Sequence, residues 1–440
     1  MAPGIDADVV VVGAGMAGVT AAREMRRRGL DVVVLEAGQR VGGRVHTVRD
    51  FAPSPVEAGA EFIHGVGAAT WADVREAGLH TIAVPQRRSW LHLAGTTRWL
   101  PLHLASPDAW HSLAILRAVR RADEDVSAAA FVADKGYRRR AEELAGLTLG
   151  AHLPGALEEI GVRGLVADGV LALELGRNHR VLDGYDRLPG HVSQGADIRF
   201  GWRAAKVAWS AAGVEITSDD GRTLAARAAV TTLPHGVLHS GDVVFDPALP
   251  SEKANAIAAI RTGAVTKVLL RFDERFWPAR MAQVACGTGP MTLYWPASYG
   301  TDRSPVLVGY ATGPRAQALS EAGAEAAFDI ATDDLMRLFP RARPDRLLAD
   351  ARFVDWRSDP LARGGYTFLP PGAVGARADL AAPTTGALFW AGSATVWSPV
   401  ADTVEAAYRS GLRAAQEASA VVEGDAAPRP YRRSPGVDAS

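Results

Sequence analysis

The chain has 440 residues, of which 48% are hydrophobic, and its formal net charge is −1. This length suits about two domains of roughly 100–200 residues each, with large buried cores. The balanced charge, with no long run of one sign, argues against a nucleic-acid partner, and the single cysteine, Cys286, excludes an intramolecular disulfide or a cysteine-rich metal site.

The chain opens with a predicted β-α-β unit. The apolar run Asp8–Val12 predicts a buried parallel strand. A helix is predicted over Met16–Arg28 and ends at Gly29, and a second strand follows over Asp31–Leu35. Because such crossovers are right-handed, the two strands are expected to be parallel.

The turn of this unit carries the spacing G-x-G-x-x-G. Gly13 allows a tight turn, Gly15 lets the backbone approach a pyrophosphate, and Gly18 lets helix and strand pack. The helix N-terminus offers free N–H groups to phosphates. Glu36 ends the second strand, where its carboxylate can accept hydrogen bonds from ribose hydroxyls and would repel a 2′-phosphate. A dinucleotide other than NADP is therefore predicted.

A further glycine pair distinguishes FAD from NAD. Gly42-Gly43-Arg44 follows Glu36 closely and offers a second approach to the pyrophosphate, which a simple NAD dehydrogenase does not need. The planar guanidinium of Arg44 is suited to pair with that pyrophosphate. We therefore expect FAD.

The rest of the chain alternates between the two predicted domains. Residues 70–188 are predicted to be mostly helical, and strands and helices alternate afterwards, with the clearest strands at 206–209, 214–217, 229–234, 265–272 and 387–391 and helices at 322–338 and 403–422. We expect a discontinuous cofactor domain (1–75, 190–268 and 380–425), a substrate domain (76–189 and 269–379) and a flexible tail (426–440).

The ends and apolar runs of the chain predict its compartment. The N-terminus lacks the basic and apolar regions of a signal peptide, and no apolar run approaches the roughly 20 residues that span a bilayer. We expect a cytoplasmic protein without membrane contact.

Several further blocks of the sequence form a pattern together with the glycine loop. They are Glu57–Gly65, Thr266–Val268 with Arg275–Pro278, Trp356 with Asp359-Pro360 and Gly364–Tyr366, Phe389–Gly392, and Thr403–Gly411. This set resembles the flavin (FAD) monoamine and polyamine oxidase family. The blocks cover the cofactor region well, whereas the helical stretch 70–188 matches no motif. The resemblance implies an α/β fold, in which a Rossmann-like FAD-binding domain of the GR2 type carries an inserted α+β substrate-binding domain.

The resemblance also implies a reaction and its residues. A hydride passes from the carbon next to an amine nitrogen to flavin N5, an imine results, and O2 reoxidises the flavin to give H2O2. Lys267 would hold a water near N5, Tyr366 would form a wall of the substrate cage, Trp356 would pack near the flavin ring, and His64 would contact a substrate nitrogen. A lysine inside an apolar strand supports a special role by itself, because burying an ammonium is costly.

The predicted cofactor contacts extend beyond the first unit. The backbone N–H of Val404, at a helix N-terminus, would face the pyrimidine end of the flavin. The backbone of Val207 would touch the adenine. The complete predicted set is Gly13, Gly15, Gly18, Glu36, Gly43, Arg44, Gly59, Ala60, Glu61, Phe62, Val207, Gly392, Ser393, Thr403 and Val404, with no metal ligand.

Three positions depart from the family pattern. Gly392 is followed by Ser393 where the family often has glutamate, which should rearrange one FAD contact. Gly365 precedes the cage tyrosine where some members have a cysteine bonded to flavin, so non-covalent FAD is predicted. Thr403 stands where many members place a second aromatic, which predicts a one-sided cage.

Three other functions stay open. An L-amino acid oxidase would need an arginine over the substrate carboxylate. A biosynthetic tailoring oxidase would act on an amine or amide of a larger natural product. A flavoprotein without catalysis would serve as a binding module. The expected partners are a small amine and O2, and the sequence leaves both the amine and a homodimer undecided.

Overall fold

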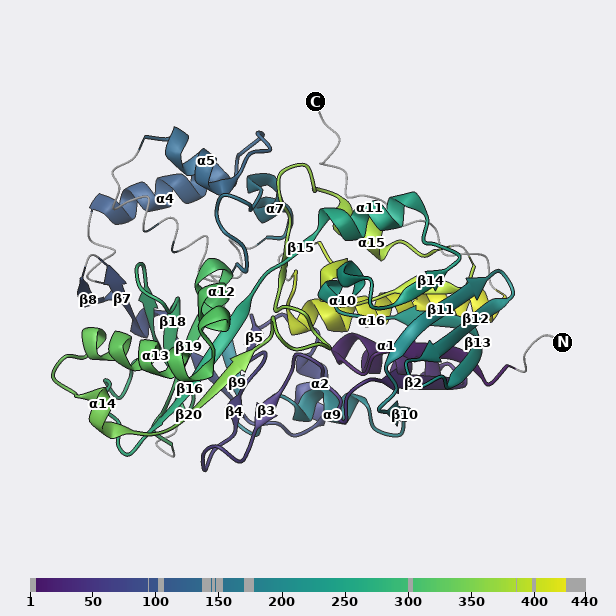
Figure 1. Ribbon diagram of the computed structural model, residues 1–440, viewed down its shortest axis with the longest axis horizontal. Coiled ribbons are helices and arrows are strands. Elements are labelled where there is room, and N and C mark those ends of the chain that lie inside the picture. The colour runs from purple at the N-terminus through teal and green to yellow at the C-terminus, as the bar shows by residue number, and fades with distance from the viewer. Residues whose placement is uncertain are drawn as a thin grey trace.

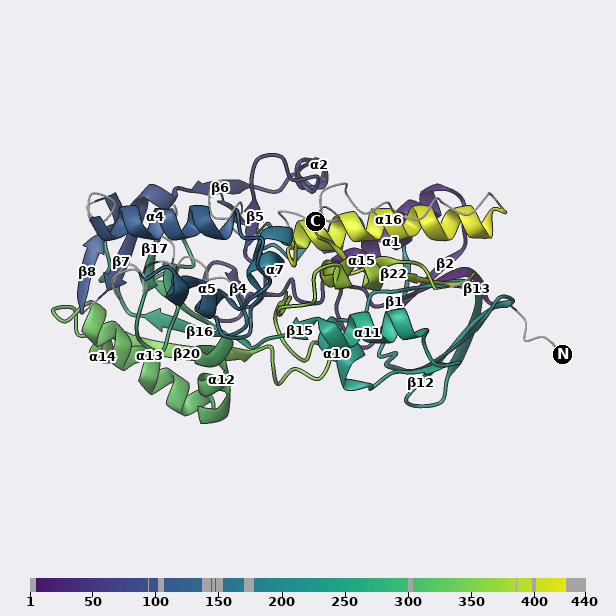
Figure 2. The ribbon, with the colours of Figure 1, turned by 90° about the horizontal axis from the view of Figure 1, so that it is seen from above.

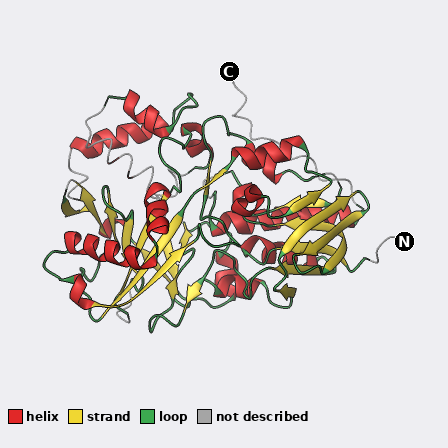
Figure 3. Cartoon of the chain, in the orientation of Figure 1, coloured by secondary structure: helices red, strands yellow, loops and turns green. Residues whose placement is uncertain are grey.

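The computed structural model describes residues 5–93, 95–101, 107–136, 144, 147, 153–169, 178–299, 304–384, 386–397 and 401–424. Two large sheets lie toward opposite ends of an elongated molecule, with helices packed around each (Figures 1 and 3). The predicted tail at 426–440 lies outside the described residues.

The first sheet contains the predicted β-α-β unit. Strands β1 and β2 are parallel, with Val9 opposite Val32, and α1 connects them. The eight strands run in the order β10-β2-β1-β13-β12-β11-β14, with β22 also paired to β13. Their bounds are β1 Ala7–Val12, β2 Val32–Glu36, β10 Asp197–Phe200, β11 Ala204–Ser210, β12 Gly213–Ser218, β13 Thr223–Thr231, β14 Val244–Asp246 and β22 Leu388–Trp390.

Helices cover both faces of this sheet. Successive side chains of a strand point to opposite faces, and those of Val9–Val12 in β1 are apolar on both, so both faces must be buried. Val9 and Val11 of β1 pack with α1 (Met16–Arg27) and α16 (Val404–Val422). Val10 and Val12 pack with α10 (His235–Ser240), α11 (Ser251–Ala259) and α15 (Ala376–Ala381). In Figure 2, α1 and α16 lie along the upper side of this half of the molecule, and α10 and α11 lie below them. The doubly covered parallel core explains the continuous valine run of β1.

The second sheet has seven strands in the order β20-β16-β19-β18-β17-β7-β8. Helices α12 (Gly313–Ala322), α13 (Ala324–Leu338) and α14 (Pro344–Leu347) lie beside it, and Gly323, with φ +84°, separates the first two. The strands are β7 Ser89–Leu93, β8 Thr96–Trp99, β16 Val265–Phe272, β17 Gln283–Cys286, β18 Leu293–Pro296, β19 Val306–Thr312 and β20 Leu348–Asp355.

Shorter elements join the two ends of the molecule. Strands β5, β9 and β6 form a three-stranded sheet, and β3–β4 and β15–β21 form two-stranded ones. The remaining bounds are β3 Thr47–Val48, β4 Val56–Glu57, β5 Phe62–His64, β6 Thr81–Val84, β9 Asn178–Val181, β15 Arg261–Thr262, β21 Thr367–Phe368, α2 Trp71–Glu76, α4 Pro107–Val119, α5 Ala128–Asp134, α7 Val162–Ala167, α9 Arg187–Val192, and the 3₁₀ turns η1 Gln86–Arg88 and η2 Ser393–Thr395.

The prediction of a mostly helical 70–188 stretch is wrong for its first third. Strands β6, β7 and β8 occupy residues 81–99, and β7 and β8 extend the second sheet. Along β7 the buried residues are Ser89, Leu91 and Leu93, a period of two that indicates a half-buried strand. Gly95, with φ +72°, makes the turn into β8. The described helices α4, α5 and α7 follow later.

The predicted domain boundary at 268 falls inside β16, all of which belongs to the second sheet. The division into domains stays a prediction, and we place this boundary before Val265. No helix in the described part of the chain combines the length and apolarity that crossing a membrane requires.

Candidate active site

The glycine loop has the geometry that the spacing predicts. Gly13 has φ +105°, and a Cβ there would lie 2.6 Å from Thr232 Oγ1. A Cβ on Gly18 would lie 1.9 Å from the carbonyl oxygen of Gly13, so only glycine lets α1 pack this closely. Gly15 is the N-cap of α1, and a Cβ there would meet no atom within 4 Å. Its missing side chain leaves open space in front of the helix N-terminus.

Glu36 lies at the end of β2 and is tied to this loop. Its Oε2 accepts a hydrogen bond from the backbone N–H of Ala14 at 2.7 Å, and its Oε1 accepts one from Gly38 at 2.7 Å. Each oxygen retains a lone pair, so the carboxylate is oriented and can still accept a hydroxyl hydrogen.

A cavity of about 690 Å³ connects the two sheets. Glu36 and the glycine loop line it from the first sheet, and Lys267 of β16 lines it from the second. The cavity therefore brings together motifs that are more than 200 residues apart. Its predicted lining residues are Gly13, Gly15, Glu36, Gly43, Arg44, Gly59, Ala60, Lys267, Trp356, Tyr366, Gly392, Ser393, Thr403 and Val404.

Five predicted residues are not among those that line the cavity: Gly18, Glu61, Phe62, His64 and Val207. Gly18 acts through packing. Val207 is buried at 1% exposure in β11, whereas Arg203 and Ala204 line the cavity nearby. A β-bulge between Ala204 and Lys206 shifts the strand register here. The contact of the Val207 backbone with the adenine stays a prediction, and Arg203 and Ala204 are the residues of this segment that line the cavity.

Lys267 is 4% exposed and donates three hydrogen bonds of 2.9 Å each. The acceptors are the carbonyl oxygens of Glu57 and Gly59 and the Oε2 of Glu61. The Oε1 of Glu61 lies 2.7 Å from Nη2 of Arg180. All three ammonium hydrogens are thus used, and a water could bind Lys267 only in place of one acceptor.

Two aromatic side chains face the cavity near Lys267. Trp356 is 6% exposed, and its Nε1 donates a hydrogen bond to the carbonyl oxygen of Ala58 at 3.1 Å. The hydroxyl of Tyr366 is hydrogen-bonded with that of Tyr310, and burial raises the pKa of Tyr366. Both rings are held in place, which suits them as cavity walls.

His64 ends strand β5. Its Nδ1 is 2.9 Å from the Oδ1 of Asn178 on β9, and its neighbour Phe62 packs edge-on against Trp295. The described residues therefore do not place His64 on the cavity wall, and its contact with a substrate nitrogen stays a prediction.

The C-terminal segment closes the cavity with a helix N-terminus. Gly392 has φ +128°, and a Cβ there would meet nothing within 4 Å. Thr403 is the N-cap of α16, and its Oγ1 accepts a hydrogen bond from the N–H of Ala406 at 3.1 Å. Many members of the family that the sequence resembles have a second cage aromatic at the position of Thr403. Of the two predicted cage positions, only Tyr366 is therefore aromatic in this chain.

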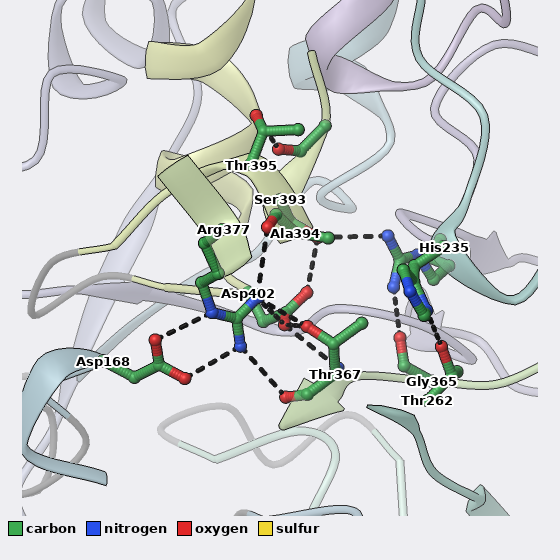
Figure 4. A network of polar contacts seen from close by, with 12 residues as sticks. Asp168, His235, Thr262, Gly365, Thr367, Arg377, Ser393, Ala394, Thr395 and Asp402 are labelled. Atoms are coloured by element: carbon green, nitrogen blue, oxygen red, sulfur yellow. Dashed lines mark hydrogen bonds and ion pairs between the residues drawn. The ribbon is translucent and has the colours of Figure 1, made fainter. Parts of the chain in front are cut away.

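A network of buried charges adjoins this segment (Figure 4). Arg377 on α15 is 1% exposed and contacts Asp168 and Asp402, and Asp402 accepts a hydrogen bond from Ser393. Sequence reasoning missed these three charged residues, because they come from α15, the end of α7 and a loop. The one available signal was an acidic residue directly before the N-cap Thr403.

These features fit FAD. Two unhindered glycines, Gly15 and Gly392, border the cavity, and the N-termini of α1 and α16 reach it. The first N–H groups of a helix have no partner within the helix and favour anions such as a pyrophosphate. Arg44 adds a positive charge beside them. FAD is bound non-covalently: Gly365 precedes Tyr366, and the one cysteine of the chain, Cys286, lies in β17, away from the cavity lining.

Comparisons with known proteins agree with this geometry. Residues 16–93 and 120–419 match the family of flavin-containing amine oxidoreductases. Polyamine oxidase 4 of Oryza sativa subsp. japonica is 29% identical over 446 residues, covering 93% of this chain and 88% of the relative. Polyamine oxidase 2 of Arabidopsis thaliana is 29% identical over 435 residues, covering 93% and 87%.

Solved structures share the fold. Cyclohexylamine oxidase from Brevibacterium oxydans IH-35A superposes with a TM-score of 0.83 at 21% identity, covering 95% of this chain and 99% of that one. Putrescine oxidase bound to putrescine superposes with a TM-score of 0.82 at 22% identity, covering 93% and 98%. With the cavity and the family match, these likenesses show the predicted amine oxidase fold. The chain belongs to the family of flavin-containing amine oxidoreductases and is an FAD-dependent oxidase of amines.

Proposed function

We propose that the substrate is an aliphatic primary or secondary amine that carries no carboxylate. The observation that supports this is the set of arginines around the cavity. Within the described residues they are Arg40, Arg44 and Arg203, which neighbour the glycine loop or the proposed adenine contact. Arg44 is the one of the three that reaches the Tyr366 side, and its Nη1 and Nη2 are engaged there by the carbonyl oxygen of Gly365 and by Ser393. A carboxylate substrate would need an arginine partner there, so an L-amino acid oxidase is disfavoured.

The names of the relatives support the same class. Polyamine oxidases match nearly the whole chain, and the structural neighbours include oxidases of putrescine and of cyclohexylamine. Bound FAD supplies the hydride acceptor and passes the electrons to O2.

The chain's own residues orient the amine and hold a proton donor. Tyr366 limits the approach of the amine on one side, and the smaller Thr403 leaves more room on the other. Aromatic faces also attract a cationic amine while it enters. Lys267 would exchange the carbonyl of Gly59, which borders the cavity, for a water. That water would then be held at a fixed point beside the flavin.

An anaerobic screen of flavin reduction tests this proposal. The probes are putrescine, spermidine, cyclohexylamine and benzylamine, against L-leucine, L-lysine and L-glutamate. We expect bleaching of the flavin absorbance by at least one amine and by no amino acid. Reduction by an amino acid would overturn the proposal. Reduction by none of the probes would overturn it in favour of a tailoring oxidase with a larger substrate.

The setting of the reaction is also proposed. O2 is the electron acceptor, the enzyme acts in the cytoplasm without nucleic acid or membrane, and a homodimer is compatible with the family. One equivalent of H2O2 per amine oxidised would support the first point, and rapid turnover with an artificial acceptor but not with O2 would contradict it. Light scattering of the holoprotein measures the oligomeric state.

A further inference from the structure

The cavity wall beside α16 contains a buried carboxylate, Asp402, whose two oxygens have different partners (Figure 4). Oδ2 accepts hydrogen bonds from the N–H of Thr367 at 3.0 Å and from its hydroxyl, and it lies 3.2 Å from Nη1 of Arg377. Oδ1 accepts a hydrogen bond from the hydroxyl of Ser393 at 2.6 Å. One oxygen is therefore anchored in the protein, and the other serves Ser393.

Ser393 bridges Asp402 and Arg44 through its hydroxyl. Its Oγ accepts a hydrogen bond from Nη2 of Arg44 at 3.1 Å, while Nη1 of Arg44 donates to the carbonyl oxygen of Gly365. A hydroxyl has one hydrogen and two lone pairs. Because its hydrogen goes to Asp402, a lone pair is left for Arg44. The carboxylate thus fixes the direction in which the guanidinium is held.

The charges of the network explain why Asp402 remains an anion. Arg377 donates two hydrogen bonds, of 2.7 and 2.8 Å, to Asp168, so that pair is largely neutralised by itself. Burial alone would raise the pKa of Asp402, but Arg377 and Arg44 hold it below its usual value. The negative charge of Asp402 is therefore available to Arg44 through Ser393.

We propose that Asp402 is a positioning residue for FAD, which holds Arg44 toward the cofactor through the hydroxyl of Ser393. Where the family often has a glutamate, this chain has Ser393, and the carboxylate is then supplied by Asp402, nine residues further along the chain. The side chain of Asp402 is 8% exposed and borders the cavity, as do Ser393 and Arg44. This inference rests on FAD as the cofactor and not on the proposed amine, so the substrate screen and the test below can fail separately.

The first test measures how tightly the holoprotein retains FAD, from the flavin fluorescence released on dilution. Asp402 has φ +54°, a conformation that asparagine also tolerates, so Asp402→Asn keeps the backbone. Ser393→Ala removes the bridging hydroxyl and leaves the Asp402–Arg377 pair intact. We expect each to raise the Kd of FAD about tenfold, the usual effect of losing one charge-assisted hydrogen bond. An unchanged Kd in Ser393→Ala would overturn the proposal.

A cycle of variants shows whether Asp402 acts through Arg44. In an Arg44→Met background, Asp402→Asn should raise the Kd by less than about twofold, because the group that it positions is gone. Additive effects would contradict the proposal and assign Asp402 a purely structural role. Asp345→Asn, which removes an exposed partner of Arg343 far from the cavity lining, is the matched control and should leave the Kd unchanged.

Relocating the carboxylate gives the sharpest result. Ser393→Glu alone places two carboxylates side by side and should weaken FAD binding. Combined with Asp402→Asn, it should restore the Kd to within about threefold of the parent protein. If the double variant binds FAD as weakly as the product of the two single effects, the proposal is wrong.

Discussion

Lys267 and Glu61 form a buried ion pair in which Nζ lies 2.9 Å from Oε2. Glu61 is itself held by Arg180, so the carboxylate keeps a partner when the lysine is removed. The pair couples strand β16 of the second sheet to the segment that follows β4. Because Glu61 keeps Arg180 as a partner, a substitution of Lys267 does not leave a buried carboxylate unpaired.

Lys267→Met should slow reoxidation of the reduced flavin by O2 about 100-fold, because a positioned proton donor contributes roughly that factor. Stopped-flow mixing of reduced enzyme with O2 measures the rate. Reduction of the flavin by the amine should change much less. Equal losses in both half-reactions would show that the substitution has disturbed the whole cavity.

Gly15→Ala and Gly18→Ala should have separable effects, although they lie in one motif. Gly15 has φ −67°, and a Cβ there meets no atom, so the apoprotein should keep its Tm, while the methyl group intrudes on FAD and raises its Kd about tenfold. Gly18→Ala forces α1 away from Gly13 and should lower the apoprotein Tm. Scanning calorimetry and FAD titration decide. A lowered Tm for Gly15→Ala would refute the assignment of its open side to the cofactor.

Tyr366→Phe should keep kcat/KM for the amine within about threefold, since the ring forms the wall and the hydroxyl pairs with Tyr310. Tyr366→Ala removes the wall and should lower kcat/KM about tenfold or more, because loose orientation is costly to the reaction. Tyr310→Phe is the control that deletes only the partner hydroxyl. If Tyr366→Phe were as impaired as Tyr366→Ala, the hydroxyl would have a chemical role.

His235 should make stability fall on acidification. Its Nε2 donates to the carbonyl of Ile257 and its Nδ1 lies 2.7 Å from Thr262 Oγ1. Burial lowers the pKa of His235 to about 4, so the ring is neutral near pH 7. The unfolded value is about 6.5, so the unfolded state binds more protons between those two pH values. The free energy of unfolding should therefore fall by up to roughly 3 kcal/mol as the pH drops from 6.5 to 4.

Urea unfolding at pH 7, 6, 5 and 4 measures this slope, with His235→Gln for comparison. The charged groups facing His235 are His239 on its own helix and Asp402 and Arg377 beyond, and their smaller effects on the pKa of His235 partly cancel. The variant should lose part of the pH dependence whatever its stability at pH 7. An identical slope in both proteins would place the titrating group elsewhere.

The local parts of the site could be predicted from the sequence. The glycine loop, Glu36 and the strand around Lys267 each depend on neighbours within a few residues, and periodicity reveals them. Strands β7 and β8 were missed because an alternation of buried and exposed residues over only five positions is a weak signal. The neighbouring sequence has the residue spacing of helices. The contact of Val207 with the adenine stays a prediction, because the cavity lining includes Arg203 and Ala204 of this segment but not Val207 itself.

The charged network could not be predicted, because its geometry depends on long-range packing. Asp168, Arg377 and Asp402 are separated by 209 and 25 residues, and no spacing rule links an α7 cap to a loop before α16. Arg377 reads as an ordinary helix-surface arginine in the sequence. Only the fold shows that its guanidinium is buried between two carboxylates.

The location of Cys286 bears on how the enzyme would withstand the H2O2 of the proposed reaction with O2. The thiol is 1% exposed within β17, and burial raises its pKa well above the usual value, so almost no thiolate is present for oxidation by peroxide. The chain has no second cysteine with which to form a disulfide. Repeated turnover should therefore leave the folded enzyme free of sulfenic acid and of covalent dimers.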